Sequence, residues 1–243
     1  MSQQSTNEQM NERTVAVYRT ATRKTDEFTV PYNERTTIID ALEYIRLQED
    51  PDLMYRQSCH HGSCGTCGVA VNGEFVLACI KRLADIPEDQ PVRIEPLPTM
   101  HQIGDLAFDP AEFFNEFPED ITYIRSSEVN SDAAVPSDME RYERFEDCIE
   151  CGLCVTSCPV EEDWMGPAAL ASIHRMVEKE PDQADRWLDL AADARGVERC
   201  AKNFSCSRVC PTGVAPGKRI TLLGSAIKKR AKAQAQASGE NET

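Results

Sequence analysis

Grouped cysteine spacings and a change from alternating to helical periodicity predict an α+β protein with two domains. The chain has 11 cysteines. The first group is spaced C-x4-C-x2-C with a fourth cysteine further on, and two later groups follow or nearly follow C-x2-C-x2-C-x3-C-P. These spacings predict an N-terminal β-grasp domain of the plant-type [2Fe-2S] ferredoxin kind and a C-terminal all-α domain of the bacterial-ferredoxin kind. The expected boundaries are a disordered segment 1–13, domains 14–105 and 106–235, and a flexible tail 236–243.

The first domain begins with strand-like alternation. Val15 and Val17 lie in one run, and Phe28 and Val30 in a second. The segment 36–49 then carries apolar residues at mostly helical spacing, namely Ile38, Ile39, Leu42, Ile45 and Leu47. After a glycine-rich cysteine loop come three short strand-like runs, at 69–71, 75–79 and 92–94. This order of elements is that of a β-grasp ferredoxin domain.

The second domain is expected to be helical. A stretch rich in Ser, Asp and Pro around 126–138 predicts a surface connection from the first domain. Helices are expected at 137–145, 167–179, 183–194 and 217–233. Because the later cysteine runs lie between these segments, the domain should be organised around them.

The first of these runs is complete, and it consists of Cys148, Cys151, Cys154 and Cys158, followed by Pro159. The second run has Cys200, Cys206 and Cys210. Iron prefers soft thiolate ligands, and in two-cluster ferredoxins the last cysteine of each run ligates the other cluster. Crossed ligation therefore assigns a [4Fe-4S] cluster to Cys148, Cys151, Cys154 and Cys210, and a second cluster to Cys158, Cys200 and Cys206.

Asn203 occupies the place where the second run should have its fourth cysteine. An amide is a weak, hard ligand beside three thiolates, so one corner of the second cluster should stay vacant. The sequence thus predicts a [3Fe-4S] cluster. A [4Fe-4S] cluster that is labile or ligated by Asn203 is the alternative. A degenerate, empty site is disfavoured because three cysteines remain.

The N-terminal group predicts a [2Fe-2S] site on Cys59, Cys64, Cys67 and Cys79. Glycines 62, 65 and 68 interleave with these cysteines, and glycine lets the backbone turn N–H groups toward sulfur. Structural zinc is the rival ligand, but it does not require C-x4-C-x2-C with a fourth cysteine. His60 and His61 lie in the loop, as a Rieske centre would need. Because four thiols are already present, they are expected to be surface residues.

Composition excludes several classes of protein. The net charge of -15 argues against a nucleic-acid partner, because phosphate repels an acidic surface. An odd number of cysteines and a polar N-terminus without an apolar stretch argue against a secreted disulfide scaffold. A reducing, cytoplasmic compartment is therefore expected, where clustered cysteines bind metal. No apolar stretch approaches the roughly 20 residues of a membrane helix.

Three further features of the sequence bear on its binding sites. His174 is expected to be packed or to cap a helix rather than to ligate metal. The string from Gly213 to Lys218 is one residue too short for a phosphate loop, and it is rejected. Residues 218–232 carry Lys and Arg but no acidic residue, which predicts either a solvated helix or contact with anionic lipid or a partner subunit. No nucleophile–base pair or dinucleotide fingerprint is found, so substrate chemistry should occur on another chain.

A plant-type [2Fe-2S] domain is joined here to a helical domain with one complete C-x2-C-x2-C-x3-C-P run and a second run that lacks one cysteine. This combination resembles the iron–sulfur subunits of succinate dehydrogenase and fumarate reductase. The resemblance covers residues 14–235, and the local strings 51–56, 166–168 and 196–200 agree with it. It implies a partner flavoprotein with FAD, contacting residues 1–105. It also implies delivery of electrons to quinone at a membrane anchor, which faces the Cys200–Cys210 side. Haem is expected where that anchor is a cytochrome b.

The resemblance further implies a peripheral location on the cytoplasmic face of the cell membrane, within a succinate:quinone oxidoreductase. Whether the complex oxidises succinate or reduces fumarate is not encoded in these motifs. A soluble reductase complex with a non-quinone electron partner remains the alternative. A free ferredoxin-like carrier is disfavoured by the size of the chain and its long connection between domains.

The quinone end departs from the usual pattern of the family. Ala201 stands where family members often have a histidine, and it can neither donate a hydrogen bond nor carry a proton. Trp164 follows Pro159 at short distance and is the candidate quinone-binding residue, with an apolar ring and an indole donor. The competing interpretation makes Trp164 a core aromatic at the start of the following helix.

Overall fold

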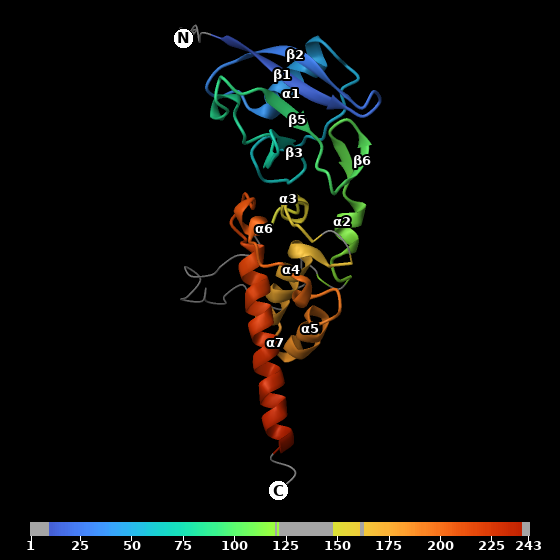
Figure 1. Cartoon of the computed structure of the whole chain (residues 1–243), viewed down its shortest axis with the longest axis vertical. Coiled ribbons are helices and arrows are strands. Elements are labelled where there is room, and N and C mark those ends of the chain that lie inside the picture. Colours follow the sequence, from blue (N-terminus) through green and yellow to red (C-terminus); the bar gives the residue numbers. More distant parts are fainter. Residues whose placement is uncertain (1–9, 120, 122–147, 161–162, 240–243) are drawn as a thin grey trace, which may run out of the picture. The chain divides into compact units, whose positions relative to one another are not determined.

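The computed structural model describes residues 10–119, 121, 148–160 and 163–239, with side chains to residue 236. The chain forms two compact units, shown in Figure 1. Unit 1 consists of Met1–Glu112 and Ile149–Thr156, and unit 2 consists of Phe113–Cys148 and Ser157–Thr243. The predicted connection around 126–138 and the predicted helix 137–145 lie outside the described residues.

Unit 1 is built on a five-stranded sheet with the order β2-β1-β5-β3-β4. Strands β1 and β5 are parallel, while β1–β2, β3–β4 and β3–β5 are antiparallel. The strands are β1 (Asn11–Arg19), β2 (Lys24–Tyr32), β3 (Gly68–Val71), β4 (Glu74–Leu77) and β5 (Val92–Glu95). With helix α1 (Ile38–Gln48) between β2 and β3, this is the predicted β-grasp order, and the α+β class is confirmed.

Helix α1 is amphipathic and buries one face against the sheet. Thr37 caps it reciprocally with Asp40, since each side chain accepts the other's backbone N–H. Ile38, Leu42 and Ile45 are fully buried. Leu47, included in the predicted apolar pattern, is 69% exposed. Its position is two residues beyond Ile45, which places it on the opposite side of a helix with 3.6 residues per turn.

The strand β1 begins at Asn11, so the prediction that 1–13 is disordered is wrong for its last residues. Asn11 pairs with Tyr32 of β2. Arg13 is buried, and its guanidinium donates to the backbone carbonyls of Leu83, Ile86, Pro87 and Gln90 at 2.6–3.2 Å. A buried arginine needs such acceptors, and they hold the start of β1 in place.

A second, two-stranded sheet was not expected from the sequence. It pairs β6 (His101–Gly104) with β7 (Ala107–Asp109). Asp105, buried in the turn between them, accepts N–H bonds from Thr20 and Met54, both at 3.0 Å. Arg19 bridges Asp105 and Asp50, and its hydrogen bond holds the pKa of Asp50 below the usual range. This network attaches the hairpin to the β-grasp core.

The segment Ile149–Thr156, which carries helix α3 (Leu153–Thr156), packs within unit 1. The Thr156 hydroxyl lies 2.8 Å from that of Thr99. Gly152 has a φ of +74°, and an added Cβ would lie 2.1 Å from the end of the Met100 side chain, which would have to move. This segment follows the predicted boundary at residue 105, a boundary that stays a prediction.

Unit 2 is helical, as predicted. Its helices are α4 (Gly166–Lys179), α5 (Ala184–Ala191), α6 (Ser205–Arg208) and α7 (Pro216–Gly239), with short 3-10 turns at Pro181–Gln183 and Val197–Arg199 (η5). Helix α2 (Ala111–Asn115) precedes them in the chain. The core contains Trp164, Leu170, Ile173, Trp187 and Leu223.

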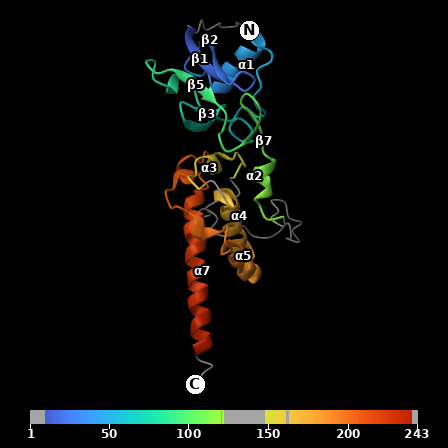
Figure 2. The same cartoon turned by 45° about the vertical axis from the view of Figure 1, so that its right-hand side comes forward.

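Helix α7 is longer than predicted, and it includes residues 236–239 of the expected flexible tail. Ala, Lys and Gln dominate its last turns, and these residues favour helix without tertiary contacts. Figures 1 and 2 both show α7 beside α4 and α5, with its C-terminal part extending beyond them. Within the described residues, no helix is long and apolar enough to cross a bilayer.

Candidate iron–sulfur centres

All 11 cysteines fall in the described part of the chain, and each is a thiol rather than half of a disulfide. Cys67, Cys79 and Cys206 are buried, and the others are partly buried. A disulfide scaffold is therefore not what the cysteines build. The structure instead gathers them around short loops between secondary-structure elements.

The N-terminal group surrounds the loop between α1 and β3, with Cys79 just after β4. Backbone N–H groups of His61 and Ser63 point at Cys59 Sγ, at 3.5 and 3.3 Å. These hydrogen bonds lower the pKa of Cys59 to about 6. The Gly62 N–H lies 3.3 Å from Cys79 Sγ, and Gly62 has a φ of +78°. Positive φ lets this loop present its amides to sulfur, as predicted.

The four thiols of this group form one set of neighbours. Cys59 is hydrogen-bonded to Cys64, and Cys67 to Cys79. Burial and then the contact with Cys79 raise the pKa of Cys67 to about 12. Burial opposes ionisation of Cys64, but hydrogen bonds from Thr66 and Cys59 leave its pKa lowered. Buried thiolates need a compensating cation, so amide donors around a four-thiol set fit an iron–sulfur cluster.

His60 and His61 are both exposed. His61 Nδ1 lies 2.5 Å from the Cys59 carbonyl, and His60 Nε2 lies 3.1 Å from Gln57 Oε1. The ligand atoms of His60, Asp40 and Glu43 lie within 4.8 Å of one another. One Asp40 oxygen is already bonded to Thr37 in the helix cap. The two histidines are therefore surface residues of the loop, as predicted.

An arginine beside this group is a feature that sequence reasoning missed. Arg56 donates to the Phe108 carbonyl at 3.3 Å, and its Cζ lies 4.4 Å from the centroid of the Phe108 ring. Burial lowers the pKa of Arg56, while the charges of Asp109 and Cys64 act against that shift. The β6–β7 hairpin thus holds a cation near a cluster cysteine. The sequence could have predicted the position of Arg56 only if the β6–β7 hairpin, which carries Phe108, had itself been predicted.

In unit 2 the fold brings Cys158 of the first run to Cys200 and Cys206 of the second. Burial raises the pKa of Cys206, and the nearby charges of Cys158 and Cys200 raise it further. Burial and the charge of Cys200 act on Cys158 in the same direction. A cluster carrying iron would offset this mutual repulsion of thiolates.

Helix α7 points its N-terminus at this trio. The Gly217 N–H is a hydrogen-bond donor to the Cys206 sulfur and lies 2.9 Å from Ser207 Oγ. An added Cβ on Gly217 would lie 2.8 Å from the Phe204 ring and 3.4 Å from Cys206 Sγ. Helix N-termini favour negative charge, which suits thiolate ligands. The close approach requires glycine at this position.

Asn203 is exposed, and its side-chain oxygen accepts two hydrogen bonds from Ser205. Its Oδ1 accepts from the Ser205 N–H at 3.1 Å and from the Ser205 hydroxyl at 2.9 Å. It thereby holds the start of helix α6, which carries Cys206. The amide oxygen that could have met iron is turned toward Ser205 instead.

Cys148 and Cys210 pack against the same small apolar cluster, formed by Ala171 and Val214 with Phe117 at its edge. The first cysteine of one run therefore lies with the last cysteine of the other. The fourth cysteine of the first run, Cys158, lies with the second run's other two, as described above. These neighbours are compatible with the crossed ligation that the spacing predicts, and the ligand sets themselves stay a prediction. Cys151 and Cys154 lie in the segment assigned to unit 1.

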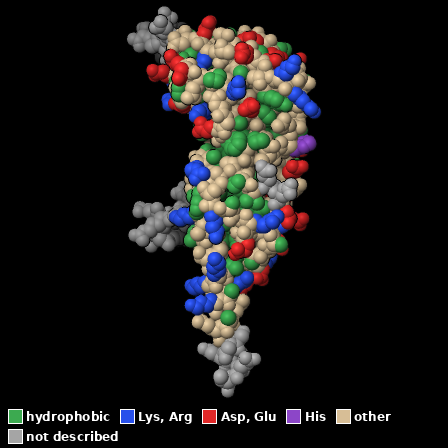
Figure 3. Space-filling model, viewed as in Figure 1, with side chains coloured by type: hydrophobic (Ala, Val, Ile, Leu, Met, Phe, Trp, Pro, Cys, Tyr) green, Lys and Arg blue, Asp and Glu red, His purple; other side chains and the backbone are tan. Residues whose placement is uncertain are grey.

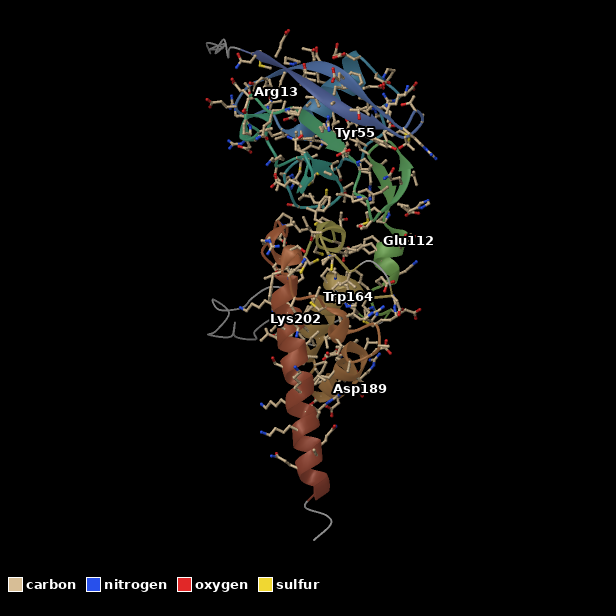
Figure 4. The ribbon with its side chains drawn as sticks, viewed as in Figure 1. Arg13, Tyr55, Glu112, Trp164, Asp189 and Lys202 are labelled. Carbon is tan, nitrogen blue, oxygen red and sulfur yellow. The ribbon has the colours of Figure 1, made fainter. Side chains whose placement is uncertain are left out.

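Trp164 is buried in the core of unit 2, where Figure 4 labels it. Cys158 and Cys200 pack against the same core. Its indole N–H donates to the Gly196 carbonyl at 2.9 Å. The indole thus stabilises the core of unit 2, and that Trp164 lies close to the cysteine trio stays a prediction. A quinone-binding role for Trp164 stays a prediction, and it would rest on the ring rather than on the occupied donor.

His174 is buried, with Nδ1 3.4 Å from Glu178 Oε2 one turn further along α4. This matches its predicted structural role. The string 213–218 forms a turn and the start of α7, where Gly213 has a φ of +75°. Neither feature adds a ligand to the cysteine sites.

The fold and the cysteine sites define an electron-carrying iron–sulfur protein. A family model described as a 2Fe-2S iron-sulfur cluster binding domain matches residues 12–115. A model described as a 4Fe-4S dicluster domain matches residues 143–214. The two matches cover all three cysteine groups and helices α4, α5 and α6.

Comparison with similar proteins shows to which family of iron–sulfur proteins the chain is related. The fumarate reductase iron-sulfur subunit of Escherichia coli is 34% identical over 202 residues, covering 79% of this chain and 82% of the relative. The mitochondrial succinate dehydrogenase iron-sulfur subunit of Dictyostelium discoideum is 32% identical over 201 residues, covering 76% and 70%. A chain of the Mycobacterium smegmatis Sdh1 complex superposes with a TM-score of 0.79 at 25% identity, covering 91% and 97%.

The chain therefore belongs to the family of iron–sulfur subunits of fumarate reductase and succinate dehydrogenase, as its motifs predict. It is an electron-transfer subunit of an oxidoreductase.

Proposed function

We propose that the chain relays electrons between the FAD of a flavoprotein subunit and a quinone held at a membrane-anchor subunit. Three clusters carry the electrons in this proposal. The [2Fe-2S] cluster is held by Cys59, Cys64, Cys67 and Cys79. The [4Fe-4S] cluster is held by Cys148, Cys151, Cys154 and Cys210. The [3Fe-4S] cluster is held by Cys158, Cys200 and Cys206.

The observation that carries the proposal is the pairing of cysteines across the two runs in unit 2. Cys148 and Cys210 pack against the same apolar cluster, while Cys158 and Cys200 are close enough to Cys206 for their charges to affect its pKa. A single site or a zinc knuckle does not need cysteines from both runs to be exchanged in this way. Two-cluster ferredoxins do.

The side chain of Asn203 supports three irons rather than four at the second site. Its oxygen is held by two hydrogen bonds from Ser205, so ligation of a fourth iron would break both. Such bonds contribute about 0.5–1.5 kcal/mol each. The three thiols of the trio therefore make up its ligand set.

When bound, iron–sulfur clusters accept and release single electrons. The protein's own part is to set their potentials and exclude water. Amide donors at Cys59, Cys79 and Cys206 stabilise negative charge, as does the nearby guanidinium of Arg56. Burial of Cys67 and Cys206 has the opposite effect, because it disfavours the more charged state.

The proposed location is peripheral, on the cytoplasmic face of the cell membrane. The flavoprotein would contact the [2Fe-2S] domain, and an anchor, with haem if it is a cytochrome b, would contact the Cys200–Cys210 side. Dicarboxylate chemistry belongs to the flavoprotein. Membership of the family of fumarate reductase and succinate dehydrogenase iron–sulfur subunits supports these proposed partners.

Purification of the native complex tests the proposal. We expect a flavoprotein and hydrophobic anchor chains to co-purify, with succinate:quinone or quinol:fumarate activity. A complex without anchor chains that passes electrons to a soluble partner would contradict the quinone part. A chain that elutes alone and supports neither activity would contradict the whole.

A further inference from the structure

Helix α7 is cationic in a strongly acidic chain. Between Lys218 and Lys232 it contains six Lys or Arg residues and no Asp or Glu, although the net charge of the chain is -15. The structure separates these cations by what they contact. That separation identifies the side of the helix that is left for a ligand.

The two arginines of α7 are used inside unit 2. Arg219 is 2% exposed, and its Nη1 lies 3.4 Å from Glu178 Oε2 on α4. Arg230 donates to Asp189 Oδ1 at 2.6 Å and to the Asp185 carbonyl at 2.7 Å, both on α5. These bonds attach α7 to the helices beside it.

Three lysines lie on the outside of the same helix. Lys228, Lys229 and Lys232 are exposed, and none has an ion-pair partner among the described residues. Lys228 and Lys232 are one turn apart, and Lys229 and Lys232 are three residues apart, so all three share one side. Figure 3 shows Lys and Arg side chains along the left-hand edge of its lower part, where Figure 1 has helix α7. We name Lys228, Lys229 and Lys232 the lysine strip.

A pocket of about 130 Å³ continues the lysine strip toward the cysteine trio. It lies between α7 and the segment 197–202, which begins with η5; Lys228 lines it from α7 and Lys202 from the loop after η5. Thr221 and Ser225 also line it, although their hydroxyl groups donate to the carbonyls of Gly217 and Thr221, and Glu198 contributes one carboxylate. Cys200, a proposed cluster ligand, also lines this pocket. Figure 4 labels Lys202 beside α7.

The type of cation favours lipid over protein as the ligand. Protein interfaces are enriched in arginine and aromatic residues and depleted in lysine. Here the arginines of α7 face inward and the lysines face outward. Flexible lysines that reach several points on a surface suit the phosphates of a bilayer, each contributing to attraction near the membrane.

We propose that the lysine strip and this pocket bind the surface of an anionic phospholipid bilayer, with one headgroup phosphate between Lys202 and Lys228. Because Cys200 lines the pocket, bilayer binding would place the lipid surface beside the cysteine trio. The use of this contact in electron delivery rests on the proposed function. The lipid binding itself does not.

Flotation of the purified, cluster-loaded full chain with vesicles tests the proposal. One set contains phosphatidylcholine alone, and the other contains about one-third phosphatidylglycerol. We expect binding to the anionic set only, with loss of binding as salt rises from about 0.1 M to about 1 M. The triple variant K228E/K229E/K232E should bind roughly a hundredfold more weakly than the unchanged chain. Lys202→Glu should weaken binding through the pocket.

A matched control carries the same change in charge elsewhere. Arg23, Lys24 and Arg93 are exposed on unit 1, and their replacement by Glu should leave most of the binding intact. Equal loss in both triple variants would reduce the effect to net charge and overturn the proposal. Equal binding of the unchanged chain to both vesicle sets would overturn it as well. If the chain then bound isolated anchor subunits but no vesicles, the lysine strip would be a protein interface. Iron content and circular dichroism check that each variant is folded.

These outcomes are separable from the proposed function. Vesicle binding needs no succinate, flavoprotein or quinone. If the chain binds vesicles but supports no quinone-linked activity, the proposed lipid binding stands and the proposed electron route to quinone is wrong.

Discussion

The close approach of the [2Fe-2S] loop to the segment carrying Cys151 makes a sharp prediction about Gly65. Its φ is +68°, and an added Cβ would lie 2.1 Å from the Ile149 carbonyl oxygen and 3.0 Å from Cys151 N. Gly73 is a matched control in the same unit. Its φ is +81°, but nothing lies within 4 Å of an added Cβ.

Both alanine substitutions incur the cost of a left-handed backbone, which is roughly 1–2 kcal/mol. Gly65→Ala also forces Ile149 back by about 1 Å to restore an ordinary contact distance. Overpacking of this kind costs about 1–3 kcal/mol. We therefore expect Gly65→Ala to lower the free energy of unfolding by about 2–5 kcal/mol, and Gly73→Ala by about 1–2 kcal/mol.

Urea unfolding of the cluster-loaded chain, followed by circular dichroism and by visible absorbance of the clusters, measures this difference. The midpoint for Gly65→Ala should be clearly below that for Gly73→Ala, and absorbance should be lost first. Equal midpoints for the two variants would refute the reasoning, because they would mean that the Ile149–Cys151 backbone does not lie against Gly65.

Three further predictions concern the electron path. Asn203→Cys should convert the second site from three irons to four and lower its potential, so the near-isotropic paramagnetic signal of the oxidised protein should disappear; an unchanged signal in a folded variant would show that the vacancy is set elsewhere. Arg56→Gln should lower the midpoint potential of the [2Fe-2S] site in a redox titration, because a nearby cation favours the reduced cluster, whereas Arg46→Gln, which removes a cation stacked near Tyr55, should shift it less. An equal shift in the two would contradict a specific role for Arg56. Trp164→Leu should reduce quinone-linked activity while succinate oxidation with an upstream dye acceptor is largely kept; equal loss in both assays, or loss of the clusters, would assign Trp164 to folding alone.

The β-grasp elements and the cysteine groups follow from local sequence patterns. Val15, Val17, Phe28 and Val30 alternate as a half-buried sheet requires, and the helix 38–48 has its cap and apolar face within its own residues. Cysteine spacing suffices to predict the crossed ligation, because the ligand geometry of a cluster constrains only a few residues at a time. Such features need no knowledge of distant contacts.

What the sequence did not predict depends on contacts between distant residues. Arg13 belongs to an ordered strand because four carbonyls between Leu83 and Gln90 accept hydrogen bonds from its guanidinium. The β6–β7 hairpin depends on Asp105 reaching Thr20 and Met54, and the position of Arg56 depends on that hairpin. Trp164 is a single residue with two competing interpretations, and the hydrogen bond to Gly196 is invisible in its local sequence.

Iron and acid-labile sulfide analysis, combined with paramagnetic resonance of the oxidised and reduced chain, determines directly how many clusters the chain holds and of which kind. We predict about nine irons per chain, distributed over [2Fe-2S], [4Fe-4S] and [3Fe-4S] clusters, with the three-iron signal in the oxidised state. About ten irons without that signal would contradict the vacant corner at Asn203. Two zinc ions and negligible sulfide would contradict the electron-transfer role assigned to all three cysteine groups.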